Sequence, residues 1–223
     1  ENMDATIAPR VMTKRGIQLN SEFRYLEPGF KGVTRLEYLP NDQLTSTNRY
    51  AFAVLHDHTF APGLTGNLNL NGVSDDQYFA DLSSKVHMVS QANLLRQGSV
   101  SYGAGWWNAS ALVQSFQTLQ DPKAPTVKPY YRVPQLTASA IRPDLPGGMS
   151  FAFSGEFVRF DHPTLVSGER LVLYPQFSLP IQTAALFVTP KLGLHTTRYA
   201  LHDQAPDAPD RTIPAAISIG TNP

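Results

Sequence analysis

The side chains best able to do chemistry in this sequence are two histidines, two adjacent aspartates and one glycosylation sequon. His56 and His58, in "HDH", share one side of a predicted strand and could chelate a metal, but no third ligand can be identified; a solvated strand end near a turn is the alternative. Asp75 and Asp76 open the longest connection, and no spaced acidic ladder follows them, which favours a turn or capping role over a calcium site. Asn108 opens "NAS" at a strand start. These residues predict no catalytic centre and no metal site.

Other signs of enzymatic chemistry are missing from the sequence. It contains no Gly-x-Ser-x-Gly elbow, no phosphate-binding glycine loop and no His-Glu-x-x-His motif. It has no cysteine, so thiolate nucleophiles, disulfides and thiolate zinc sites are excluded. Its 18 basic and 18 acidic residues leave no net charge to attract nucleic acid. We therefore expect a protein that is not an enzyme and has no cofactor.

The elements that would position these residues are nearly all strands. From Gly16 to Leu26, apolar and polar residues alternate, which is typical of a strand with one apolar and one wet face. The one helical candidate is "YFADLSSKVHMVSQANLL", and no apolar run approaches the ~20 residues of a membrane helix. Many strands reach the ~9 to 11 residues of tilted membrane strands. The predicted strands are 4–12, 16–26, 32–39, 49–58, 64–73, 94–104, 107–119, 130–142, 149–160, 169–179, 185–199 and 211–219.

The connections alternate between short and long. The tight connections are "EPGFK", "FAPG", "GAGWW", "PDLPGG" and "PIQT". The other connections between predicted strands are mostly long. This alternation favours an up-and-down meander whose two ends face different compartments, with short periplasmic turns and long outer loops. We therefore predict an all-β, antiparallel up-and-down transmembrane β-barrel, here an incomplete arc of about 11 to 12 strands. A soluble β-sandwich binding module and a general porin remain the alternatives.

The alternation also assigns faces. The apolar parity, with Ile17, Leu19, Phe23, Leu68 and Phe153, is expected to face lipid. Aromatic residues near strand ends are expected in interfacial girdles; they are Tyr25, Tyr38, Phe60, Trp106, Trp107 and Phe160. The polar parity suits a hydrated lumen, where its members either contact a substrate or plug or simply solvate the interior. These lumen-facing candidates are Gln18, Asn20, Glu22, Arg24, Thr65, Asn67, Asn69 and Asn71.

Three stretches follow one another along the chain: "NMDATIAPRVMTKRGIQLNSEFRYL", "LEYLPND" and "VSDDQYFADL". In this order they resemble strands and loops of the LptD family. Its members are lipopolysaccharide-assembly outer-membrane proteins, also called organic solvent tolerance proteins. The resemblance implies a cell outer membrane location and transport of lipopolysaccharide into the outer leaflet. It implies four partners: lipopolysaccharide, outer-membrane lipid, a plug lipoprotein LptE, and a periplasmic bridge protein LptA. Against the family pattern, residues 1–223 are expected to form part of one barrel domain, without the N-terminal periplasmic jelly-roll domain and the closing strands.

Overall fold

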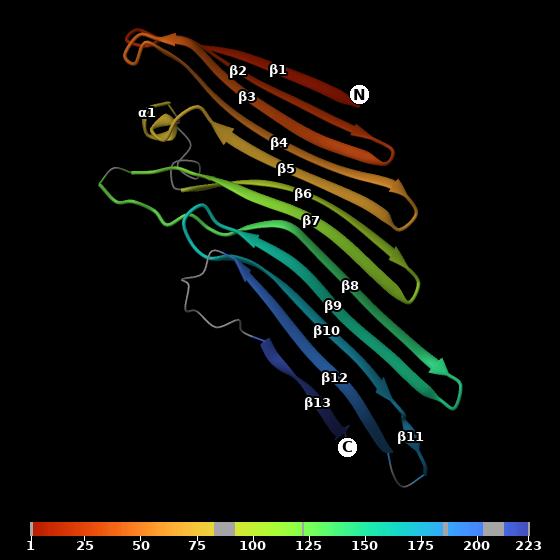
Figure 1. Cartoon of the computed structure of the whole chain (residues 1–223). Coiled ribbons are helices and arrows are strands. Elements are labelled where there is room, and N and C mark those ends of the chain that lie inside the picture. Colours follow the sequence, from red (N-terminus) through yellow and green to blue (C-terminus); the bar gives the residue numbers. More distant parts are fainter. Residues whose placement is uncertain (1, 83–91, 122, 185–186, 203–211, 223) are drawn as a thin grey trace. The chain divides into compact units, whose positions relative to one another are not determined.

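The computed structural model describes residues 2–82, 92–121, 123–184, 187–202 and 212–222 (Figure 1). The strands are β1 (Met3–Met12), β2 (Gly16–Glu27), β3 (Phe30–Asp42), β4 (Thr47–Ala61), β5 (Leu64–Val73), β6 (Asn93–Ala104), β7 (Trp107–Thr118), β8 (Tyr131–Leu145), β9 (Met149–Asp161), β10 (Ser167–Ser178), β11 (Ile181–Gln182), β12 (Phe187–His202) and β13 (Thr212–Asn222). All twelve predicted strands are therefore present, with β11 as a short addition.

The strands form one sheet in up-and-down order. Each strand from β1 to β9 neighbours the next along the chain, and β12 then pairs with β10, β11 and β13. Neighbouring strands run antiparallel, as in β1 with β2 and β12 with β13. β1 and β13 lie at opposite ends of this order and are not neighbours. The described residues thus form an all-β up-and-down sheet that does not close on itself, which confirms the predicted fold and excludes a two-sheet sandwich for this part of the chain.

The predicted helix is much shorter in the structure. The helix α1 (Tyr78–Leu82) begins where the sequence predicts it and has five residues. Residues 83–91 of the predicted helix lie outside the described residues, and 93–95 belong to β6 instead. No helix among the described residues is long and apolar enough to span a membrane.

The chain divides into two compact units, of which the first is Glu1–Ser99 with Gln114–Tyr131. Its strand register links the two predicted polar rows on one face, because Glu22 is opposite Arg35, Arg35 opposite Ala53, and Ala53 opposite Asn71. Since alternate residues of a strand point to opposite sides, the apolar parity of these strands lies on the other face.

That apolar face is exposed rather than covered. Val11 retains 75% of its accessible surface and Ile17 retains 59%, and Phe23 and Leu36 are also exposed. Leaving so many large apolar side chains in water would forfeit about 1.5 to 3 kcal/mol for each one that could be buried. Contiguous exposed apolar surface of this kind marks an interaction site with a membrane or a protein.

The second unit comprises Val100–Val113 and Arg132–Pro223 and repeats the two-faced pattern. Phe157 of β9 is opposite Leu171 of β10, and Phe151 is opposite Phe177. On the other side of the same strands, Arg170 donates to Glu156 at 2.8 Å. The guanidinium of Arg170 also lies over the ring of Phe160, so Phe160 shares the polar face. The prediction that Phe160 belongs to a lipid-facing girdle is therefore wrong.

Candidate functional site

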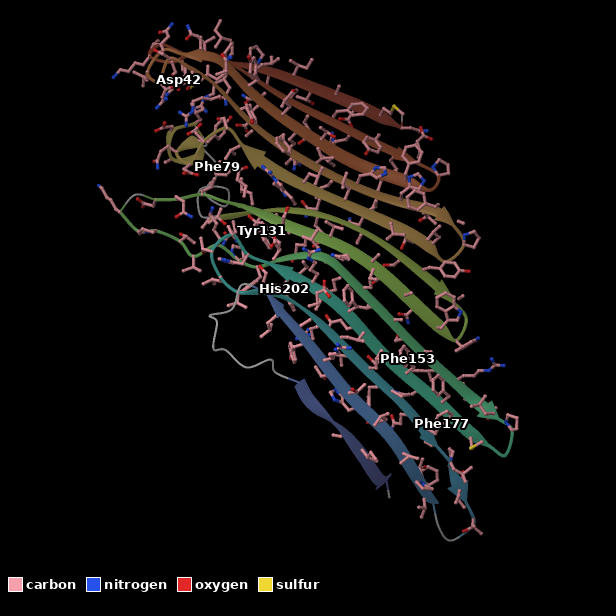
Figure 2. The ribbon with its side chains drawn as sticks, viewed as in Figure 1. Asp42, Phe79, Tyr131, Phe153, Phe177 and His202 are labelled. Atoms are coloured by element: carbon pink, nitrogen blue, oxygen red, sulfur yellow. The ribbon has the colours of Figure 1, made fainter. Side chains whose placement is uncertain are left out.

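The most elaborate polar arrangement lies where the β5–β6 connection folds back onto the polar face of the first unit. We call Ser74–Leu82 the α1 segment; Figure 2 shows Phe79 of this segment and Asp42 of β3 at the same end of the strands. Gln18 Nε2 donates to the Tyr78 hydroxyl at 3.0 Å, and that hydroxyl donates to Glu37 Oε2 at 2.8 Å. The α1 segment is thereby tied to Gln18 of β2 and Glu37 of β3, which precede Tyr78 by 60 and 41 residues.

Apolar contacts hold the same segment from beneath. Small and branched residues of the polar parity replace polar ones near the strand ends and meet the apolar side chains of α1. The buried cluster consists of Leu39, Ala51, Val73, Tyr78, Phe79, Leu82 and Leu94, with Met12 and Leu119 packed against it. The polar face is thus interrupted by a small core, which exists because the α1 segment supplies its cover.

An ionic cluster fixes the start and end of the α1 segment to the strands. We call Arg15, Asp42, Arg49, Asp75 and Asp81 the Arg49 cluster. Arg49 donates through Nε and Nη2 to the two carboxylate oxygens of Asp75, at 2.9 and 2.7 Å, and through Nη1 to Asp81 at 2.7 Å. Arg15 Nη1 donates to Asp42 at 2.6 Å, and Arg49 Nη1 approaches the same oxygen at 3.3 Å. The planar guanidinium suits this two-pronged binding better than a lysine would.

Burial makes the Arg49 cluster energetically important. The side chains of Arg49 and Asp42 are 2% and 0% exposed. Removing one partner of a buried ion pair costs about 3 to 5 kcal/mol, because the other charge stays buried without compensation. The two arginines face three aspartates, and backbone N–H groups also stabilise two of the carboxylates. The Leu44 N–H donates to Asp42, and the Gln77 N–H donates to Asp75.

Two groups of the α1 segment have shifted pKa values. Burial alone would raise the pKa of Asp75, but hydrogen bonds from Arg49 and Ser74 and the positive charge of Arg49 outweigh it, so the pKa of Asp75 lies below its ordinary value. Burial, then the charge of Glu37 and its hydrogen bond, raise the pKa of the Tyr78 hydroxyl. The Tyr78 hydroxyl therefore stays protonated and donates a hydrogen bond to Glu37, while Asp75 stays ionised opposite Arg49.

The four β2 candidates lie on the polar face, and three of them, Gln18, Glu22 and Arg24, have hydrogen-bond partners within the chain. Gln18 is 1% exposed beneath Tyr78, so no other molecule can reach it while α1 is in place. Glu22 accepts from Arg35 at 2.6 Å, and Arg24 donates to Asp4 at 3.0 Å. Asn20 is half-buried opposite Glu37. Contact of these residues with a substrate or plug remains a prediction, now least favoured for Gln18.

The β5 row keeps more of its surface. Asn67 donates to Asp57 at 2.7 Å, and Asn71 donates to Asn69 at 2.7 Å and to the Leu95 carbonyl at 2.9 Å. Thr65, at the start of the row, is exposed. The row therefore presents uncharged hydrogen-bonding groups along β5, and its contact with a substrate or plug remains a prediction.

The two histidines lie on the apolar face. His56 is opposite Gly32 and Leu68, and His58 stacks on Phe60 with ring centroids 4.1 Å apart. The Tyr25 hydroxyl and His56 Nδ1 are 2.6 Å apart. Within the described residues, no three side chains of His, Cys, Asp or Glu are grouped to hold a metal ion. The two imidazoles instead belong to an aromatic cluster near the short turns.

Sequence reasoning missed the Arg49 cluster, although it assigned Asp75 a turn role. The Asp75 carbonyl does accept from the Tyr78 N–H at 3.2 Å, as a turn requires. The partners of Arg49 on the α1 segment are 26 and 32 residues away, so no local spacing links them. One signal was available in the sequence. The polar parity of β3 and β4 carries the apolar residues Leu39 and Ala51 beside Arg49, which could have indicated that the polar face is covered at these strand ends.

An up-and-down antiparallel sheet with one exposed apolar face and one polar face is the architecture of the wall of a β-barrel. Comparison with known families agrees. The model of the LptD family, described as LPS transport system D, matches residues 47–219. The chain therefore belongs to the LptD family.

Individual relatives cover nearly the whole chain. It is 49% identical to the LPS-assembly protein LptD of Azoarcus sp. (strain BH72), over 96% of this chain and 27% of the relative. It is 51% identical to the protein of that name from Aromatoleum aromaticum, over 90% of this chain and 25% of the relative. With the Nitrosomonas eutropha protein of the same name the identity is 40%, over 96% and 31%. The chain thus spans about a quarter to a third of the length of these relatives.

Proposed function

We propose that this chain forms part of the barrel wall of a translocon that transports lipopolysaccharide and assembles it into the outer leaflet of the cell outer membrane. The two-faced sheet carries this proposal. Its apolar parity is exposed at Val11, Ile17 and Phe23, as a wall in contact with lipid requires, and its polar parity offers paired charges and amides. Membership of a family described as an LPS transport system supplies the cargo.

This transport needs no covalent chemistry from the wall. The polar face provides hydrogen-bonding groups that suit sugars and phosphates, and the apolar face contacts outer-membrane lipid. A plug lipoprotein of the LptE kind would fill the lumen beside the β2 and β5 rows, and a periplasmic bridge protein of the LptA kind would deliver lipopolysaccharide. A general porin shares the two-faced wall, but the family match favours the lipopolysaccharide function.

Depletion of the full-length protein in its own host tests the proposal. We expect lipopolysaccharide to disappear from the cell surface and accumulate inside, and re-expression of the protein to restore it. Surface labelling of lipopolysaccharide, with total outer-membrane protein as the loading reference, measures this. Unchanged surface lipopolysaccharide with impaired uptake of small solutes would instead identify a porin.

A further inference from the structure

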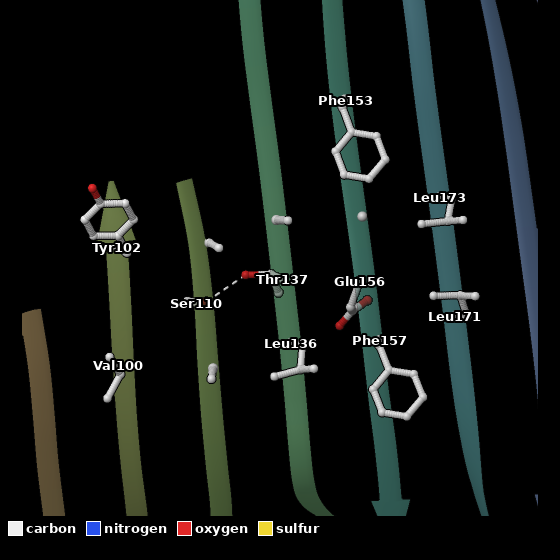
Figure 3. Close-up of a pocket in the computed structure, with 14 residues that line it drawn as sticks. Val100, Tyr102, Ser110, Leu136, Thr137, Phe153, Glu156, Phe157, Leu171 and Leu173 are labelled. Atoms are coloured by element: carbon white, nitrogen blue, oxygen red, sulfur yellow. Dashed lines mark hydrogen bonds between the residues drawn. The ribbon is translucent and has the colours of Figure 1, made fainter. Parts of the chain in front are cut away.

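The apolar face of the second unit carries a groove of about 500 Å³. Its floor is made of small residues, and larger apolar side chains rise on both sides (Figure 3). Ala111, Ala138 and Gly155 belong to the lining, and the ring of Phe153 folds over Gly155, where an added Cβ would lie 2.7 Å from the ring. Groove volumes of roughly 300 to 1,000 Å³ are those of small-ligand sites.

A second hollow, of about 250 Å³, adjoins the groove and brings charge to its end. It shares Phe157 and Leu171 with the groove and adds Glu169 and Arg198. The register explains the junction, since Phe157 is opposite Leu171, and Leu171 is opposite Arg198. An apolar channel therefore ends beside a guanidinium within one row of three strands.

The charges in this hollow favour an anionic group. Glu169 is opposite Arg159 in the register, so the charge of Arg159 offsets that of Glu169. Arg198 is exposed and forms no ion pair with any residue in the described ranges. A guanidinium binds phosphate in a two-pronged geometry. Glu169 can accept a hydrogen bond from a hydroxyl next to that phosphate.

The position of the charges along the strands also fits a membrane lipid. Arg159 and Glu169 lie close to the long connection between β9 and β10, whereas the groove runs from Phe157 toward the short turn after β8. Long connections belong to the outer side of such barrels. The apolar part of the site thus lies at the depth of acyl chains, and Arg198 lies near the outer head groups.

We propose that the groove and the adjoining hollow bind one lipopolysaccharide molecule of the outer leaflet, with an acyl chain along Ala111 and Ala138 and a lipid A phosphate on Arg198. The choice of this phosphorylated glycolipid rests on the proposed function, since the outer leaflet is where that function places lipopolysaccharide. The site lies on the outer side of the wall, apart from the polar face along which cargo would pass.

Native mass spectrometry of the full-length protein in detergent, titrated with lipid A, tests the site. Arg198→Ala removes the phosphate partner and should weaken lipid A binding about tenfold, the worth of one charge-assisted hydrogen bond. Ala111→Trp fills the groove and should weaken lipid A binding because it excludes the acyl chain. The matched control is Arg142→Ala, which removes a guanidinium from the same parity of β8 as Ala138, at the end where Arg142 lies over Trp106. Heat-dependent gel mobility shows that each variant is folded.

Four outcomes decide between this site and its alternatives. Dephosphorylated lipid A should bind wild type and Arg198→Ala equally, because the arginine then has no phosphate to hold. Equal lipid A binding by wild type, Arg198→Ala and Ala111→Trp overturns the site, and so does a dimer that Ala111→Trp dissociates, since a second copy would then occupy the groove. Absence of lipopolysaccharide transport in cells, with Arg198-dependent lipid A binding intact, would refute the proposed function and leave this site standing.

Discussion

The Tyr78 hydroxyl lies 3.0 Å from Gln18 Nε2. A residue of the α1 segment thus accepts a hydrogen bond from one of the predicted lumen-facing side chains of β2. Gln18 is 1% exposed as a result. The polar face near these strand ends is therefore not an open surface. The chain covers it with its own α1 segment, and the ionic bonds of Arg49 and the apolar contacts of Phe79 and Leu82 keep the segment there.

Replacement of Arg49 should release the α1 segment. Arg49→Met leaves Asp42 buried without its second partner and removes both bonds to Asp75, so we expect a loss of about 3 to 5 kcal/mol in the stability of the docked segment. Hydrogen exchange of residues 74–82 in the full-length protein measures the effect. Arg35→Met, which breaks the exposed pair with Glu22, is the control and should cost less than about 1 kcal/mol. Equal exchange in both variants would contradict the role of Arg49.

Acid should open the same segment. The pKa of Asp75 is lower in the folded protein than its ordinary value, so its contribution to stability is present above the ordinary pKa and is lost as the pH falls through the folded pKa. We expect the open population of residues 74–82, from hydrogen exchange corrected for intrinsic rates, to grow below about pH 4. Asp75→Asn should already be open at neutral pH, whereas Asp76→Asn, at the exposed neighbour, should behave as wild type.

The strands could be predicted because the polarity of each residue in a two-faced strand indicates which face of the sheet its side chain lies on. Leu64–Val73 was predicted to the residue, since apolar or glycine positions alternate with polar side chains from Leu64 to Asn71. The Arg49 cluster could not be predicted, because its bonds depend on where a connection folds after the sheet has formed. Phe160 was misplaced for a related reason: its aromatic ring suits a girdle, but its parity and its contact with Arg170 put it on the polar face.

The face assignment can be tested with adjacent residues of β5. Leu68 is opposite His56 on the apolar face, and Asn69 is opposite Leu55 on the polar face. An arginine at the bilayer midplane costs about 2 to 4 kcal/mol on the lipid side, so Leu68→Arg should lower the folding yield of the full-length protein into liposomes. Asn69→Arg should fold as wild type does. Similar yields for the two variants would reject the assignment, and so would the reverse order.

Gly32 is a strand glycine that lies under the aromatic side chain of Tyr25. The Tyr25 hydroxyl occupies the space that a Cβ of Gly32 would need, and that Cβ would also lie 2.7 Å from the Leu55 carbonyl oxygen. The tyrosine could move, but the paired backbone of β4 cannot, so Gly32→Ala should overpack this site and cost about 1 to 3 kcal/mol. It should also separate Tyr25 from His56, with which it now makes a 2.6 Å contact. Gly103→Ala is the control, because nothing lies within 4 Å of its added Cβ, and in a strand it should be neutral or mildly stabilising. Urea unfolding of the full-length protein from liposomes measures both, and a Gly32→Ala variant as stable as Gly103→Ala would show that the cover by Tyr25 is not a constraint.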